Sequence, residues 1–196
     1  MKAFLYWLAS LTWGGIMTWI GIVIAIILSP VWIIKKRKPQ IFGHNIYFEI
    51  GKGWGGVNFG AICFVSVGSS NRTKCHEHGH GLQNICWGVL FPFVIALPSA
   101  YRYWMRDFKN KDLFAFLVWG AVILTNIAIC VVVGVTGWKW LLYICLGLAI
   151  YVTALTVWAF LVEIPRYSKN NVPYDSIWFE GQATKWGTEY IDRNGR

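Results

Sequence analysis

Residues 75–83 read Cys75-His76-Glu77-His78-Gly79-His80-Gly81-Leu82-Gln83 and contain the pattern HExxH. If residues 73–87 form a helix, positions four apart share a face, so His76 and His80 can bind one metal ion together. Glu77 then lies beside the metal, where its carboxylate can accept a proton from a metal-bound water. The spacing therefore predicts a zinc site with His76 and His80 as ligands and Glu77 as the catalytic base.

The segments before the motif predict its structural setting. A turn rich in helix-capping residues, 68–73, predicts the start of the motif helix. Within that helix, Gly79 and Gly81 lower helix propensity by roughly 1 kcal/mol each relative to alanine, so we expect them to permit close approach of another backbone or a ligand. Further upstream, β-branched and aromatic residues flank a glycine-rich loop and predict a short β-hairpin within residues 41–67. The second strand of this hairpin could instead begin a membrane segment.

The composition indicates an integral membrane protein. Hydrophobic residues make up 56% of the 196 residues and charged residues only 14%, which is more apolar surface than a soluble domain of this length can bury. A membrane-spanning helix needs about 20 apolar residues, and three stretches reach that length: 3–34, 113–135 and 138–162. The first is long for one span, so we expect Gly14-Gly15 and Pro30 to break it. A cleaved signal peptide is the less favoured reading of this stretch.

A fourth apolar run, residues 85–101, is shorter and contains two prolines. We expect this run to be membrane-associated without crossing; the alternative is that it spans. Residues 73–106 thus comprise the motif helix and the membrane-associated run. The predicted fold is a mainly α integral membrane protein, one membrane domain of residues 1–196. It has about three transmembrane helices, a zincin-like α+β core with the short β-hairpin, and a C-terminal helix at 174–192.

The net charge of +9 is distributed as the positive-inside rule describes. Basic residues directly follow the first apolar stretch, precede the second and follow the third. This pattern predicts an N-terminus outside, with the motif and the C-terminal tail both on the cytoplasmic side. The lipid bilayer accounts for the basic residues, so nucleic acid is not expected as a partner. The five cysteines form no CxxC pair and are expected to be reduced; Cys75 points about 100° away from His76 and is expected to be a bystander.

A catalytic zinc site needs three protein ligands, so one more is required. Acidic residues are scarce, and besides Glu77 the candidates are Glu49, Asp107, Asp112, Glu163, Asp175, Glu180, Glu189 and Asp192. We expect Asp175 to cap a helix and Glu163 to mark a membrane boundary. Glu180 lies in the segment Trp178-Phe-Glu-Gly-Gln-Ala-Thr-Lys-Trp-Gly187.

This segment resembles the membrane-bound gluzincin metallopeptidases, which include the CAAX prenyl proteases and the heat-shock membrane proteases. In that family HExxH is followed far downstream by Glu-x-x-Ala-Asp-x-x-Gly, and Glu180, Ala183 and Gly187 match this pattern. The resemblance implies that His76, His80 and Glu180 bind Zn²⁺ and that Glu77 activates a water. Thr184 stands where the family has an aspartate that supports a ligand histidine, although a hydroxyl can also hydrogen-bond.

The chain also resembles a group of small bacterial membrane proteins with an HExGH motif. Their pattern of HE-x-GH-x-x-Q, an apolar run with Pro-Ser, and a late Glu-x-x-Ala corresponds here to residues 76–83, 92–99 and 178–187. The resemblance covers about residues 40–190 and implies a location in the bacterial inner membrane. Peptide bonds of a peptide or membrane-protein substrate would be hydrolysed at or near the cytoplasmic face. Residues 55–60 are our candidate for an edge strand that binds an extended peptide.

Other functions remain open on the sequence alone. The strongest alternative is a catalytically inactive zinc-binding membrane protein that acts as a scaffold or partner-binding module. A site-2-type intramembrane protease would need an aspartate from another span, and residues 113–162 contain none. A transporter is poorly supported because the only polar side chains there, apart from hydroxyls, are Asn126 and Lys139. The residue that would stabilise the oxyanion formed during hydrolysis is not determined by the sequence, and the candidates are Tyr174, His44 and His78.

Overall fold

A computed structural model describes residues 3–107, 111–163 and 173–194. The chain divides into two compact units, each described here by itself. The motif unit comprises Met1–Ala96 and Pro173–Arg196, and the hairpin unit comprises Leu97–Val172. The basic residues expected at 166–169 lie outside the described residues, as do the side chains of Asp107 and Asp112.

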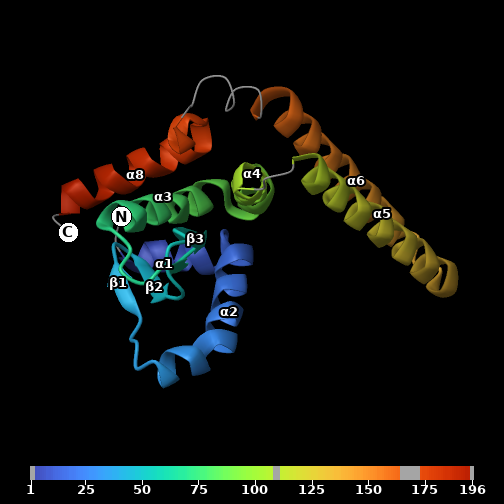
Figure 1. Cartoon of the computed structure of the whole chain (residues 1–196). Coiled ribbons are helices and arrows are strands. Elements are labelled where there is room, and N and C mark those ends of the chain that lie inside the picture. Colours follow the sequence, from blue (N-terminus) through green and yellow to red (C-terminus); the bar gives the residue numbers. More distant parts are fainter. Residues whose placement is uncertain (1–2, 108–110, 164–172, 195–196) are drawn as a thin grey trace. The chain divides into compact units, whose positions relative to one another are not determined.

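The motif unit combines helices with one small sheet (Figure 1). Its main elements are α1 (Ala3–Leu11), α2 (Gly15–Ile34), β1 (Gln40–Phe42), β2 (Asn45–Glu49), β3 (Gly56–Phe59), β4 (Ile62–Val65), α3 (Asn71–Trp87) and α8 (Trp178–Asn194). Short helical turns follow α3 at Gly88–Leu90 and Pro92–Ala96 and precede α8 at Tyr174–Ser176. The hairpin unit contains α4 (Leu97–Asp107), α5 (Lys111–Thr136) and α6 (Trp140–Trp158), which continues as a π-helical turn at Ala159–Glu163.

The sheet differs from the single hairpin expected within 41–67. It has four strands in the order β1-β2-β4-β3, and β2 pairs with β4 in parallel. The expected second strand folds back on itself at Gly60, whose φ of 66° suits a tight turn, and the Asn58 side chain accepts a hydrogen bond from the Gly60 N–H at 2.8 Å. The hairpin is therefore β3–β4, and β3 forms one edge of the sheet, as expected for residues 55–60.

Among the described residues, three helices are long and apolar enough to cross a membrane: Gly15–Ile34, Phe116–Thr136 and Trp140–Glu163. The expected break of the first stretch near Gly14-Gly15 is confirmed, because α1 ends at Leu11 and α2 begins at Gly15. The expected break at Pro30 is wrong, since Pro30 lies inside α2. The nitrogen of Pro30 carries no hydrogen and cannot donate to the carbonyl of Ile26, four residues earlier. The Ser29 hydroxyl donates to this carbonyl instead, at 2.8 Å.

The fourth apolar run forms no single helix of spanning length among the described residues. Residues 85–101 are divided among the end of α3, the two short turns and the start of α4. Gly88, whose φ is 53°, ends α3, and Pro92 begins the second short turn, where its missing backbone donor is tolerated.

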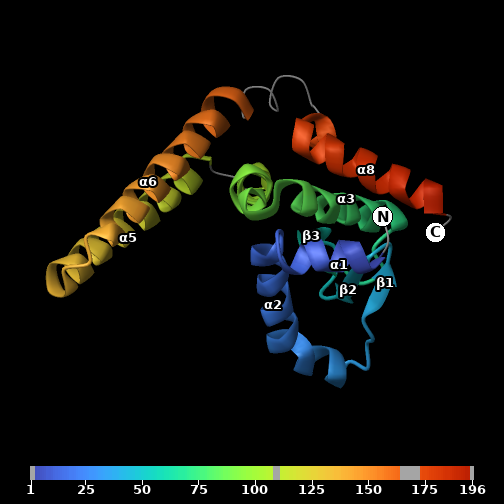
Figure 2. The ribbon, with the colours of Figure 1, turned by 180° about the vertical axis from the view of Figure 1, so that it is seen from behind.

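Helix α3 lies in the middle of the motif unit. Figures 1 and 2, which are opposite views, both show α3 between α8 on one side and the sheet with α1 on the other. The sheet packs in turn against α2 around the buried residues Trp32, Ile62 and Phe64. The Trp32 indole N–H donates to the carbonyl of Glu49 at 2.7 Å, which joins the end of α2 to the end of β2.

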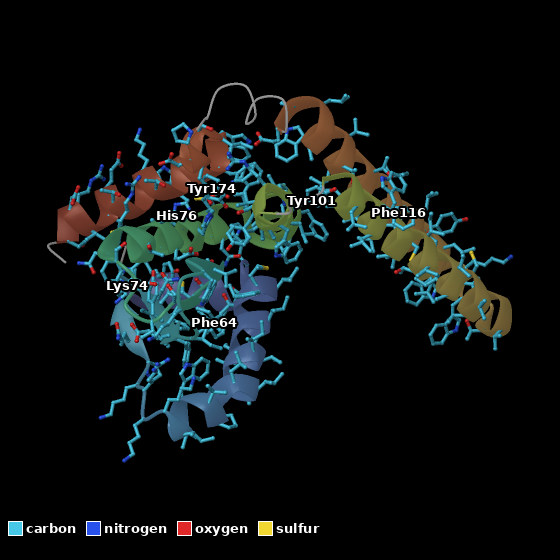
Figure 3. All side chains as sticks on the ribbon, viewed as in Figure 1. Phe64, Lys74, His76, Tyr101, Phe116 and Tyr174 are labelled. Atoms are coloured by element: carbon cyan, nitrogen blue, oxygen red, sulfur yellow. The ribbon has the colours of Figure 1, made fainter. Side chains whose placement is uncertain are left out.

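The hairpin unit is built on α5 and α6, which are joined by a turn at Gly137, between the predicted stretches 113–135 and 138–162. Its outer side chains are apolar and exposed; Phe116, for example, projects from α5 into the surroundings (Figure 3). Where α4 meets this hairpin, Arg102 and Glu163 form a buried ion pair of 2.8 Å, so Glu163 has a structural partner inside its own unit.

Candidate metal centre

The motif helix forms where the sequence predicts it and begins two residues earlier, at Asn71. Ser70 is the N-cap, and its hydroxyl accepts a hydrogen bond from the Thr73 backbone N–H at 3.2 Å. The helix continues to Trp87 and ends at Gly88. His76 and His80 consequently lie one turn apart on the same face of α3.

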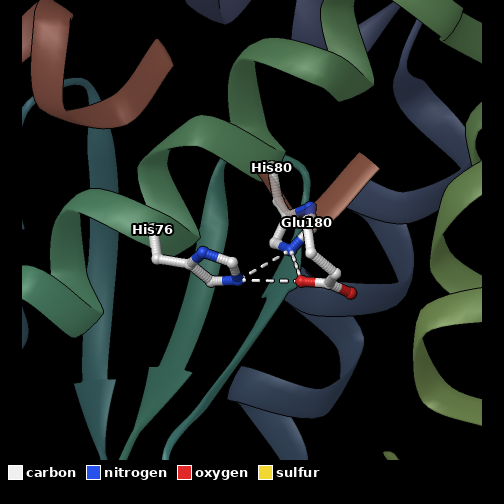
Figure 4. Close-up of side chains that lie close together, drawn as sticks. All are labelled: His76, His80 and Glu180. Carbon is white, nitrogen blue, oxygen red and sulfur yellow. Dashed lines mark hydrogen bonds and ion pairs between the residues drawn. The ribbon is translucent and has the colours of Figure 1, made fainter. Parts of the chain in front are cut away.

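The two histidines converge with Glu180 from α8 (Figure 4). Glu180 Oε2 lies 3.1 Å from His76 Nε2 and 3.4 Å from His80 Nε2, and the two Nε2 atoms are 3.2 Å apart. The Glu180 side chain is fully buried. Within the described residues, this is the group of histidine, cysteine and acidic side chains whose geometry could hold a metal ion. The structure thus brings together the three residues that the sequence predicted as ligands, and Cys75 is not among them.

Small residues allow α8 to approach α3 closely enough for this convergence. A Cβ atom on Gly79 would overlap the carbonyl oxygen of Ala183, and one on Gly187 would overlap the carbonyl oxygen of Cys75. Ala183 and Gly187 follow Glu180 by three and seven residues, so all three lie on the face of α8 that meets α3. The expected close approach at Gly79 is therefore confirmed, and the partner is the backbone of α8.

Each ligand histidine is oriented by a hydrogen bond at its other ring nitrogen. His76 Nδ1 lies 2.9 Å from the Thr184 hydroxyl, and His80 Nδ1 lies 2.8 Å from Gln83 Oε1. The Gln83 amide nitrogen donates to the carbonyl of Phe179 at 2.7 Å, so its oxygen faces His80 and accepts the Nδ1 proton. Nε2 of His80 is then the lone-pair nitrogen that a metal requires. Thr184 therefore provides the hydrogen bond that orients the His76 ring.

The charge and lone pairs of His76, His80 and Glu180 favour a cation bound among them. Burial acts to raise the pKa of Glu180, but contact with His76 and His80, when their Nε2 atoms carry protons, outweighs burial and lowers it, so the carboxylate is ionised. A carboxylate oxygen and two imidazole nitrogens that face one another repel unless a proton or a metal ion lies among them. The Tyr174 hydroxyl donates to the other oxygen of Glu180 at 3.2 Å and holds Oε2 towards the histidines. Two imidazoles and one carboxylate form a donor set typical of catalytic zinc sites, so the residues fit this metal.

Glu77 lies between the metal centre and the edge strand. Its side chain is buried, and Oε2 makes no hydrogen bond within the described part of the chain. Burial raises the pKa of Glu77 to about 7, while His76 acts to lower it and Glu180 to raise it further. Strand β3 passes directly beside this carboxylate, because a Cβ on Gly56 would lie 2.7 Å from Glu77 Oε1. Asn58, also in β3, donates from its amide to the Glu77 carbonyl at 2.9 Å.

The three oxyanion candidates are separated by the structure. Tyr174 adjoins the metal centre through Glu180, whereas His78 and His44 belong to a different polar cluster. His78 Nδ1 lies 2.6 Å from Asn45 Oδ1, and His44 Nε2 lies 2.6 Å from the Tyr190 hydroxyl. Burial lowers the pKa of His78 to about 4, and His44 acts in the same direction, so His78 is a neutral core residue.

Asp175 also has a structural partner, Arg72, at 3.8 Å. Gln83 and Asn58 were not predicted as functional residues, although the position of Gln83 three residues after His80 places it within reach of that ring. No known family model matches the sequence, and comparisons with curated proteins and with solved structures likewise find no match. The chemistry of the centre must therefore be inferred from the residues of this chain.

Proposed function

We propose that the protein is a membrane-embedded zinc metalloprotease that hydrolyses peptide bonds at or near the cytoplasmic face of the bacterial inner membrane. The observation that carries the proposal is the convergence of His76, His80 and Glu180, with the buried carboxylate of Glu77 beside them. A histidine pair one helical turn apart, a carboxylate from a second helix and an adjacent general base are together the requirements of zinc-dependent peptide hydrolysis.

Different residues of the chain would perform the separate parts of this reaction. Zinc, when bound, supplies a water whose pKa is near 7. Glu77 would accept the proton of that water and pass it to the leaving amine, since its buried Oε2 makes no other hydrogen bond within the described residues. Thr184 and Gln83 fix the ring orientations of the histidines. Strand β3 supports the proposal because an edge strand offers main-chain groups to an extended peptide directly beside Glu77.

The orientation in the membrane is part of this proposal. Residues Lys35 to Lys38 directly follow α2 and form no ion pair within the described residues. Such a basic cluster favours the cytoplasmic side of the membrane. The N-terminus would then lie outside, and the segment with the motif would face the cytoplasm. The partners are the bilayer and a peptide or membrane-protein substrate.

The second candidate function is a zinc-binding scaffold without hydrolytic activity. Thr184 favours it, because a hydroxyl beside His76 lacks the negative charge that makes a ligand imidazole more basic. The presence of Glu77 in the position of a general base favours the enzyme.

The two functions are separated by measuring zinc content and peptide cleavage on the same purified protein. The parent is expected to hold one zinc per chain and to cleave members of a peptide library in lipid nanodiscs. Glu180→Ala should lose the zinc, whereas Glu77→Gln should keep the zinc and lose cleavage. Glu189→Gln is the matched control, because Glu189 is on α8 but pairs with Lys185 and Arg193 at the surface. Zinc in the parent without any cleavage would favour the scaffold, and parent-like cleavage by Glu77→Gln would refute the proposed mechanism.

A further inference from the structure

Asn126 places an amide at the midpoint of a helix of spanning length. The apolar segment of α5 runs from Phe116 to Thr136, so Asn126 is ten residues, or about 15 Å, from each end. Its only hydrogen bond within the described residues runs from Nδ2 to the carbonyl of Val122, at 2.8 Å. An asparagine amide has two donors and an oxygen with two lone pairs, so most of this capacity remains. In hydrocarbon, such groups are costly unless they find a partner.

The amide lies on a defined face of the hairpin unit. Trp119, Ile123, Asn126 and Cys130 follow one another at intervals of four, three and four residues, which is the spacing of a single helix face that packs against another helix. With Ala149 from α6, they line a shallow groove of about 620 Å³. The groove thus has apolar walls with the polar amide at its centre.

Among the residues that the structure describes, the other helix of spanning length outside the hairpin unit offers no matching partner. The exposed face of α2, the remaining helix of spanning length, consists of isoleucine, valine, tryptophan and proline side chains. Its hydroxyl groups are engaged within the motif unit: Thr18 is fully buried, and Ser29 donates to the carbonyl of Ile26. Lipid acyl chains at this depth carry no hydrogen-bonding group. A second copy of α5 does, because its own Asn126 lies at the same depth.

We propose that the protein forms a parallel dimer through α5, with the Asn126 amides of the two copies hydrogen-bonded to each other. All copies of one membrane protein share one orientation, so the twofold axis is parallel to the membrane normal and equal positions meet. The inference rests on the membrane-embedded part of the proposed function and is independent of the metal centre. Polar side chains are a recognised source of association between membrane helices.

Cys130 allows the contact to be tested directly. It is exposed, one turn beyond Asn126 on the same face, so the two copies of Cys130 should meet in the dimer. In full-length protein carrying Cys86→Ser, which removes the exposed cysteine of the motif unit, mild oxidation in membranes is expected to form a dimer linked through Cys130. The matched control combines Cys130→Ala with Ala128→Cys, which moves the thiol to the opposite face of α5 and should abolish cross-linking.

The role of the amide is measured by energy transfer between labelled copies in liposomes at a series of protein-to-lipid ratios. Asn126→Leu should weaken dimerisation by about 3- to 30-fold, and Asn126→Gln should retain it. Equal dimerisation by Asn126→Leu, or equal cross-linking from both cysteine positions, would overturn the proposal. Zinc content and cleavage are recorded for the same samples. A monomeric parent with normal zinc and cleavage would refute the dimer alone, and a dimer without zinc would refute only the metal centre.

Discussion

Gly79→Ala tests whether the contact between α3 and α8 assembles the metal centre. The new Cβ would overlap the carbonyl oxygen of Ala183 and lie 2.8 Å from its Cα, whereas ordinary van der Waals contact begins at 3.4 Å. The carbonyl carbon of Ala183 would lie nearer still, at 2.5 Å, so the backbone of α8 must move away by at least about 0.9 Å. Glu180 is on the same face of α8, one turn earlier, so its carboxylate moves with the helix.

This movement can be converted into expected losses. Ligand distances in a metal site tolerate only about 0.2 Å of change, so the carboxylate would leave the coordination sphere or strain it. We expect zinc affinity to fall by about 10- to 100-fold or more, the range found when support for a ligand is lost. The free energy of unfolding responds to two opposing effects. Alanine favours the helix by about 1 kcal/mol, and overpacking costs about 1–3 kcal/mol, so we expect a net loss of up to about 2 kcal/mol.

The assay pairs competition for zinc against a chromophoric chelator with thermal unfolding of the metal-free protein, followed by tryptophan fluorescence. Gly147→Ala is the matched control, because it also adds a methyl group inside a helix but meets nothing within 4 Å. The control should keep the parent zinc affinity and unfolding midpoint. If Gly79→Ala did the same, close packing of the two helices could not be what positions Glu180.

Three further substitutions test other parts of the structure. Gly56→Ala places a Cβ 2.7 Å from Glu77 Oε1, so peptide cleavage should fall by about 10-fold or more with zinc content unchanged; parent-like cleavage would count against Glu77 as the base. Thr184→Val removes the hydrogen-bond partner of His76 and should weaken zinc binding by about 10- to 100-fold, whereas Thr184→Ser should restore it; equal affinities would leave the hydroxyl without a role. Arg102→Met leaves a buried carboxylate unpaired and should cost about 3–5 kcal/mol in unfolding free energy, seen as a lower thermal midpoint; an unchanged midpoint would contradict the importance of that ion pair.

The helices of spanning length were predictable because hydropathy and length are local properties of the sequence. The expected segments 113–135 and 138–162 correspond to α5 and to α6 with its π-helical turn, with ends that differ by a few residues. The outcome at Pro30 was not predictable from proline alone, because it depends on whether a neighbouring side chain can replace the missing donor. Ser29 does so, and the pair Ser-Pro in an apolar helix is a readable signal for this behaviour.

The sheet was less predictable because its central pairing is not local. The glycine-rich loop at 51–56 suggested the turn of a hairpin, but the tight turn forms at Gly60, where Asn58 stabilises it. An asparagine two residues before a glycine is a local signal for such a turn. The parallel pairing of β2 with β4 joins residues that no turn connects directly, so neither strand identifies the other by its sequence.

The position of the proposed third ligand, Glu180, depends on how closely α8 packs against α3. The spacing of HExxH selected His76 and His80, but composition left eight other acidic residues open, and Glu180 was chosen by resemblance. Of all nine acidic residues, only Glu180 is followed by alanine at the third position and glycine at the seventh. These small residues let the backbone of α8 touch α3 at Gly79. Backbone contact between α8 and α3 brings the carboxylate to the histidines. A methyl group added at Gly79 should therefore weaken zinc binding even though all three ligands are still present.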